Sequence, residues 1–201
     1  MNWATGGVTG SAASPLLPGL DAAFPSAYII GWRGNSNNGC WRKWLAFFML
    51  NDVYNTKILQ LAGSIPRIGR MPDAHGSATA HSKLCGSTVT VDLKMDGDTV
   101  TDFSHDVKAC ALGQASSSIM AQHVIGSQAE ELRSLRETVR QMLKENGAPP
   151  SGKWADIAVL EPVRDYKARH ASTLLTFDAV VSAIDQIEQK RKVAKETEPA
   201  S

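Results

Sequence analysis

The strongest constraint on the fold is a run of alternating apolar and polar residues that leads into a tight turn. Residues 87–95 carry the alternation, with Val89, Val91, Leu93 and Met95 as the apolar set. A period of two is that of a strand with one buried face. Asp96-Gly97 follows at once and is a strong two-residue hairpin signal. Residues 98–107 are therefore predicted to return as an antiparallel strand, although their alternation is imperfect.

The rest of the patterned sequence predicts one further strand and several helices. The strand is expected at residues 77–84, and apolar residues recur at helical spacing in 54–62, 113–125, 128–144 and 167–190. Strands that precede most of the helices indicate an α+β fold. We expect a small antiparallel three-stranded sheet covered by helices, in a domain that spans residues 49–190. Residues 191–201 are expected to be a charged tail.

Residues 1–48 differ from the remainder. They are rich in Gly, Ala, Ser, Pro and Trp, have no helical or alternating period, and contain Asp21 as their only acid. This composition is typical of disorder. The alternative is that translation begins at Met49, where patterned sequence starts. A signal peptide is a weaker interpretation, since the apolar run 44–50 lies far from the N-terminus with no small-residue cleavage site after it, and a transit peptide would be arginine-poor.

Composition excludes several classes of protein. Apolar residues make up 43% and charged residues 20%, as in soluble globular proteins, and the net charge of +1 gives no reason to expect a nucleic-acid partner. No apolar run is long enough to span a membrane. Three cysteines are too few and odd in number for a disulfide-stapled secreted domain. We therefore expect a cytoplasmic protein with free thiols.

Two of the cysteines flank the predicted hairpin. With the turn at Asp96-Gly97, Cys85 faces Lys108 and Cys110 lies two residues further on. Diagonal neighbours of this kind are roughly 7 to 8 Å apart. The two thiols are thus predicted to meet at the open end of the hairpin, close enough to share a metal ion or a cluster.

Cys110 also precedes a predicted helix. Unpaired N–H groups at a helix start favour negative charge, and thiolate is the form of cysteine that binds metal or attacks sulfur. Two simpler interpretations remain: both residues are ordinary core cysteines, or they form a disulfide. Two cysteines alone are a weaker sign of metal or sulfur chemistry than a CxxC pair.

Three segments together resemble the cysteine motifs of the NifU/IscU/SufU scaffolds. They are Leu-Cys-Gly-Ser at 84–87, Cys-Ala-Leu-Gly-Gln-Ala-Ser-Ser-Ser at 110–118 and Ala-Arg-His-Ala-Ser-Thr-Leu at 168–174. The resemblance covers residues 50–190 and implies a SufE/NifU-like fold. The long insert between Gly126 and Trp154 is closer to the SufU branch than to the shorter IscU branch.

The resemblance implies a scaffold rather than a conventional enzyme. Such a protein accepts sulfur from a cysteine desulfurase, assembles a transient [2Fe–2S] cluster and passes it to recipient apo-proteins. In the SufU branch the same site holds zinc during sulfur transfer. A zinc-dependent sulfurtransferase that stimulates a desulfurase is therefore the alternative, and a metal-free regulatory relative is a third.

This chain departs from the family pattern at two positions. The family's third cysteine falls at Ala171, and the aspartate two residues after the first cysteine is Ser87. The histidine that precedes the third cysteine in the IscU branch has its match in His170. The expected ligands are therefore Cys85, Cys110 and His170.

Three ligands are fewer than the four that a [2Fe–2S] cluster or structural zinc commonly takes from protein. Two chains can share one cluster as a homodimer, His81 or His105 can fill the gap, or small thiols or water can complete the site. Arg164 and Arg169 flank the third motif. They either steer a desulfurase and stabilise a persulfide, or form a solvated basic face.

Overall fold

A three-stranded antiparallel sheet in the order β1-β2-β3 forms one layer of the fold. Its strands are β1 (Gly76–His81), β2 (Thr88–Asp96) and β3 (Thr99–Lys108). The computed structural model describes residues 55–197, so the predictions for residues 1–48 and for Cys40 fall outside the described part of the chain. Sheet and helices confirm the predicted α+β class.

The hairpin exists, but its register differs from the predicted one. Asp96 pairs with Thr99, so the two loop residues are Gly97 and Asp98, one position later than predicted. Gly97 has a φ of +52°, and glycine adopts this conformation at the first central position of such turns without strain.

An irregularity in the ladder between Lys94 and Met95 shifts the pairing again. As a result Thr88 faces Lys108, and the predicted pairing of Cys85 with Lys108 is wrong.

β1 is also shorter than predicted, because the chain turns after His81. Ser82 N–H donates to the Ser87 carbonyl and Gly86 N–H donates to the Ser82 carbonyl, both at 2.9 Å. Gly86 has a φ of +67°, which closes this turn. Cys85 therefore lies in the β1–β2 loop rather than on a strand.

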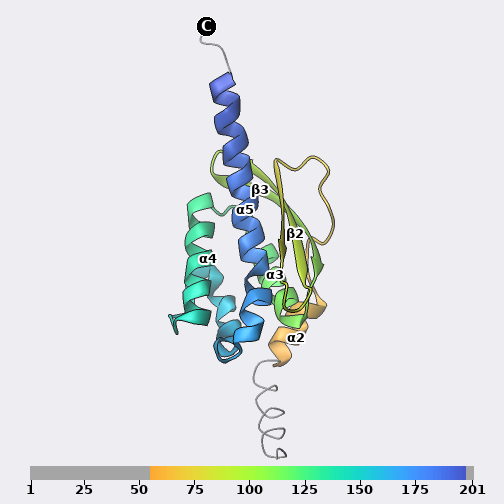
Figure 1. Cartoon of the computed structure of the whole chain (residues 1–201), viewed down its shortest axis with the longest axis vertical. Helices are drawn as coiled ribbons and strands as arrows, with labels where there is room; N and C mark the ends of the chain where they lie inside the picture. Colours follow the sequence, from red (N-terminus) through yellow and green to blue (C-terminus); the bar gives the residue numbers. More distant parts are fainter. Residues whose placement is uncertain (1–54, 198–201) are drawn as a thin grey trace, which may run out of the picture. The chain divides into compact units, whose positions relative to one another are not determined.

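Helices form the second layer. They are α2 (Thr56–Gly63), α3 (Ala111–His123), α4 (Ala129–Lys144), the 3-10 helix η2 (Gly152–Asp165) and α5 (Lys167–Thr197). Figure 1 shows α5 running beside the sheet, and it packs against β1, β2, α3 and α4. Helices were predicted close to α2, α3, α4 and α5. α5 continues beyond the predicted end at residue 190, so the first part of the expected tail is helical.

The core lies between the sheet and the helices, and α2, α3, α4, η2 and α5 all contribute to it. The apolar set that alternates along β2 is buried, as predicted: Val89, Val91, Leu93 and Met95. Leu174, Phe177, Val181 and Ile184 contribute the buried stripe of α5.

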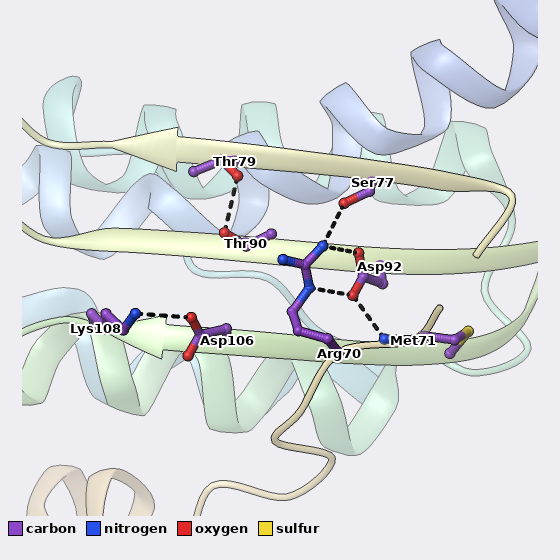
Figure 2. Close-up of polar contacts among 8 residues, drawn as sticks. All are labelled: Arg70, Met71, Ser77, Thr79, Thr90, Asp92, Asp106 and Lys108. Carbon is purple, nitrogen blue, oxygen red and sulfur yellow. Dashed lines mark hydrogen bonds and ion pairs between the residues drawn. The ribbon is translucent and has the colours of Figure 1, made fainter. Parts of the chain in front are cut away.

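The other face of the sheet is polar and carries an ion pair between a buried carboxylate and an exposed arginine (Figure 2). Asp92 is only 1% exposed, and its carboxylate accepts from Arg70 Nε at 2.7 Å, Arg70 Nη2 at 3.0 Å and Met71 N–H at 2.9 Å. These bonds hold the pKa of Asp92 below its usual value even though burial opposes the charge. The loop before β1 is thereby fixed to the sheet, on the face opposite α5.

Candidate metal and sulfur site

Three separate elements supply the groups at the candidate site. Cys85 comes from the β1–β2 loop, Cys110 from the residue directly before α3, and Ser172 from the first part of α5. Cys85 is exposed and Cys110 is half-buried, and neither forms a disulfide. The site thus combines an accessible thiol with a sheltered one.

Two loop serines hold Cys85. Its Sγ lies 3.0 Å from Ser87 Oγ and 3.3 Å from Ser82 Oγ. Both serines are almost fully buried, at 4% and 3% exposed. Because the two serines directly follow β1 and directly precede β2, the sulfur position is tied to the sheet. Ser87 thus places a neutral hydroxyl, which can donate a hydrogen bond, beside the sulfur.

This environment favours the charged form of Cys85. Partial desolvation is the largest influence and opposes ionisation, but the hydroxyls of Ser82 and Ser87, the Ser87 N–H and the Ser172 hydroxyl together outweigh it. They lower the pKa of Cys85 from 9.0 to about 7. A hydroxyl can donate to a thiolate, so each bond strengthens when the proton leaves. About half of the Cys85 thiols are therefore ionised at neutral pH.

Cys110 occupies the N-cap position of α3, with extended backbone angles of φ −66° and ψ 168°. Its Sγ lies 3.5 Å from Ser172 Oγ. The prediction that Cys110 precedes a helix is confirmed, although α3 begins at Ala111 rather than at residue 113.

Gly113 lets α3 approach α5 closely. A Cβ at this position would lie 3.0 Å from the carbonyl oxygen of Ser172 and 2.8 Å from the Cβ of Ala109. Any larger residue would push these groups apart, so glycine sets the distance between Cys110 and Ser172.

Ser172 is the group that relates the two thiols. Its hydroxyl contacts Cys110 and also stabilises the charge on Cys85. The β1–β2 loop and α5, rather than the pairing of the hairpin, link the two thiols to this serine, and their expected close approach stays a prediction. Sequence reasoning gave Ser82 and Ser172 no role, because serines are common and only the tertiary contacts distinguish these two.

His170 is buried and already engaged. Its Nε2 lies 3.1 Å from the Val163 carbonyl and 3.0 Å from the Arg164 carbonyl, which joins the end of η2 to α5. Nε2 must carry the proton to donate to these oxygens, which leaves Nδ1 as the nitrogen with a lone pair. Within residues 55–197, no group of three or more His, Cys, Asp or Glu side chains is arranged to hold a metal ion.

The other histidines considered as ligands have local partners. His105 is fully buried in β3, where its Nε2 bonds the Pro66 carbonyl at 2.9 Å. Burial lowers the pKa of His105, so it is neutral and structural. His81 is exposed, and its Nδ1 lies 3.1 Å from Thr88 Oγ1.

A hollow of about 540 Å³ lies beside this region, with Ala171, Lys144, Lys167, His81 and His170 among its lining residues. Lys144 and Lys167 give the hollow positive charge, which the Asp178 carboxyl group in the same lining partly offsets. Arg164, by contrast, is paired with Glu161. Within residues 55–197, no helix has the length and apolar character needed to cross a membrane.

Comparisons with known proteins show which family this chain resembles. The model of the NifU-like N terminal domain family matches residues 53–173. The chain is 27% identical over 135 residues to the iron–sulfur cluster assembly scaffold protein IscU of Thermotoga maritima, which covers 67% of this chain and 94% of that protein. It is 27% identical over 104 residues to the zinc-dependent sulfurtransferase SufU of Bacillus subtilis, covering 52% and 71% respectively.

A solved structure extends the likeness to three dimensions. The crystal structure of the N-terminal part of a nitrogen-fixing NifU-like protein from Brucella abortus matches with 63% sequence identity and a TM-score of 0.69. The match covers 71% of this chain and 99% of that structure. The family match spans more than half of the residues, so the chain belongs to the NifU-like N-terminal domain family.

Proposed function

We propose that this chain is a scaffold on which an iron–sulfur cluster is assembled, with Cys85 and Cys110 as its thiolate ligands. The observation that carries the proposal is a pair of free thiols from distant segments, one exposed and one half-buried, that share one serine: Ser172 contacts Cys110 and favours the charged form of Cys85. Thiolates are the usual protein ligands of such clusters. The cluster is the cargo: a cysteine desulfurase supplies its sulfur, and apo-proteins receive it.

The small ligand set suits transient binding. Two thiolates give half of the four ligands that a [2Fe–2S] cluster commonly has. Nδ1 of His170 is proposed as a third, and a second chain in a homodimer or a small thiol as the remainder. A cluster held by few protein ligands exchanges them readily for those of a recipient. A reducing cytoplasm keeps both thiols free for this chemistry.

Cys85 is the thiol that we expect to receive sulfur. Its thiolate attacks the outer sulfur of a persulfide on the desulfurase cysteine, forming a new S–S bond. The S–S bond of the desulfurase persulfide breaks, and the desulfurase cysteine leaves as a thiolate. The product is a persulfide on Cys85, with no net oxidation or reduction. The exposure of Cys85 and its lowered pKa both favour this attack.

The same properties favour a second candidate, a zinc-dependent sulfur acceptor, as in the relative named SufU. Zinc with an exchangeable position needs about three protein ligands plus water. Cys85, Cys110 and His170 would be those ligands. Metal analysis of freshly purified protein separates the two, since this candidate requires about one zinc per chain and the scaffold requires none.

Anaerobic reconstitution of the full chain with iron and sulfide tests the scaffold. We expect sulfide-to-iron charge-transfer absorption in the visible region, which Cys110→Ser abolishes. Ser116→Ala is the matched control, because Ser116 is a buried serine of α3 that bonds only the Leu112 carbonyl. Absence of iron and sulfide uptake by the unaltered chain would refute the proposal. Desulfurase binding that survives Cys85→Ser/Cys110→Ser would then favour a metal-free regulator.

A further inference from the structure

We propose that Ser172 is a positioning residue that redirects its single hydroxyl proton onto the ligating sulfurs when a cluster binds. The inference rests on the proposed function of Cys85 and Cys110 as cluster ligands. Ser172 would act through these two sulfurs and would not bind the metal itself.

The position of Ser172 is unusual because three groups compete for its hydroxyl. Ser172 is fully buried, and its Oγ lies 2.9 Å from the Arg169 carbonyl and 3.5 Å from Cys110 Sγ. It also contributes to stabilising the charge on Cys85. A serine hydroxyl has one proton to donate and two lone pairs to accept with. Only one of the three groups can therefore receive that proton at a time.

While both cysteines keep their protons and no metal is bound, the Ser172 proton has a clear destination; only a charged sulfur, such as the Cys85 thiolate, draws it away. The Ser172 hydroxyl donates to the Arg169 carbonyl, and the Cys110 thiol donates to Ser172 Oγ. A metal-bound cysteine has lost its proton and can only accept. The hydrogen bond between Cys110 and Ser172 then survives only if its direction reverses. Reversal is favourable, because a bond to a charged sulfur is stronger than one to a neutral carbonyl.

The Arg169 carbonyl does not lose its partner in this exchange. Thr173 Oγ1 also donates to it, at 3.0 Å. The hydroxyl of Ser172 can therefore rotate away while the Arg169 carbonyl keeps a hydrogen bond. An unpaired buried carbonyl would otherwise cost free energy and oppose the rotation. Thr173 thus leaves the hydroxyl proton of Ser172 free to be donated to a sulfur.

The backbone around Ser172 is held in place. Gly113 of α3 lies against the Ser172 carbonyl, where even a methyl group would be only 3.0 Å away. Cys85 is held independently by Ser82 and Ser87. Ser172 is accordingly the group shared by the β1–β2 loop, the start of α3 and α5, and we infer that it sets how the two sulfurs are presented to the cluster.

The test compares Ser172→Ala with the unaltered full chain after anaerobic reconstitution. Removing a hydrogen bond to a metal ligand commonly costs roughly tenfold or more in metal affinity. We expect Ser172→Ala to lose its cluster to a chelator roughly tenfold faster, with an altered visible circular dichroism spectrum. Ser172→Thr keeps the hydroxyl and should restore both, provided that its far-ultraviolet spectrum shows a folded chain.

Ser116→Ala serves as the matched control, since it removes a buried serine hydroxyl of α3 that touches no sulfur. It should leave the loss rate and the spectrum unchanged. Equal loss rates and spectra for Ser172→Ala and the unaltered chain would overturn the inference while the scaffold stands. Failure of the unaltered chain to take up a cluster would overturn the scaffold, and this inference with it.

Discussion

Replacing Ser87 with alanine should make Cys85 a weaker acid. Ser87 Oγ is the nearest hydroxyl to the sulfur, at 3.0 Å, and the pKa of Cys85 is about 7. A hydrogen bond to a charged group contributes about 1.5 to 3 kcal/mol when well sheltered. Cys85 is exposed, so solvent replaces part of the lost bond, and we expect a rise of about one pKa unit, or about 1.4 kcal/mol.

A higher pKa of Cys85 lowers its thiolate fraction at neutral pH. The thiolate fraction of Cys85 at pH 7 should fall from about one half to about one tenth. A more basic thiolate is also a stronger nucleophile, so the alkylation rate at one pH understates the change. The better measure is the midpoint of the pH profile for iodoacetamide alkylation, followed by mass spectrometry of the peptide that contains Cys85.

Ser64→Ala is a suitable control, because the Ser64 hydroxyl bonds the Gln60 carbonyl. It should leave the midpoint where it is. A Ser87→Ala protein that is folded and keeps its midpoint near pH 7 would refute the claim that hydroxyl groups activate Cys85.

Three further predictions concern stability, each measured by urea unfolding. Gly113→Ala forces a methyl group against the Ser172 carbonyl and should lower the free energy of unfolding by about 1 to 3 kcal/mol. Burial lowers the pKa of His105 in the folded chain. The free energy of unfolding should therefore be highest above the pKa of an unfolded histidine, near 6.5, and should fall as the pH drops below that value. His105→Leu should flatten this pH dependence. Asp92→Ala leaves the Met71 N–H unpaired and should cost about 2 kcal/mol, less than a wholly buried pair, because Arg70 stays 57% exposed. An unchanged unfolding midpoint of Gly113→Ala would contradict the first prediction, and a pH dependence that persists in His105→Leu would contradict the second. The third fails if Asp92→Ala costs less than about 0.5 kcal/mol, the usual size of a surface effect.

The local elements of the fold could be predicted because their signals are local. The alternation along β2 and the glycine of the turn predicted a hairpin, and apolar spacing predicted four helices. The register was predicted wrongly for two reasons: the loop residues are Gly97 and Asp98 rather than Asp96 and Gly97, and the irregularity between Lys94 and Met95 has no sequence signal of its own. The 3-10 helix η2 was missed because its buried residues Trp154, Ile157, Leu160 and Val163 recur every third position rather than at the α-helical period.

The residues of the candidate site also fall into those that the sequence could predict and those that it could not. Cys85 and Cys110 stand out by residue type and motif. Ser82 and Ser172 do not, because their importance lies in contacts between segments that are far apart in the chain. His170 was found by its place in a motif, but its bonds to the carbonyls of Val163 and Arg164 depend on the fold of η2.

Iron and acid-labile sulfide analysis of the reconstituted chain tests the central claim most directly, because it asks whether Cys85 and Cys110 hold one cluster together. Both single variants, Cys85→Ser and Cys110→Ser, should lose iron and sulfide in parallel, whereas the unaltered chain should bind the two in equal amounts. A Cys85→Ser/Cys110→Ser chain that binds as much iron and sulfide as the unaltered protein would contradict the account.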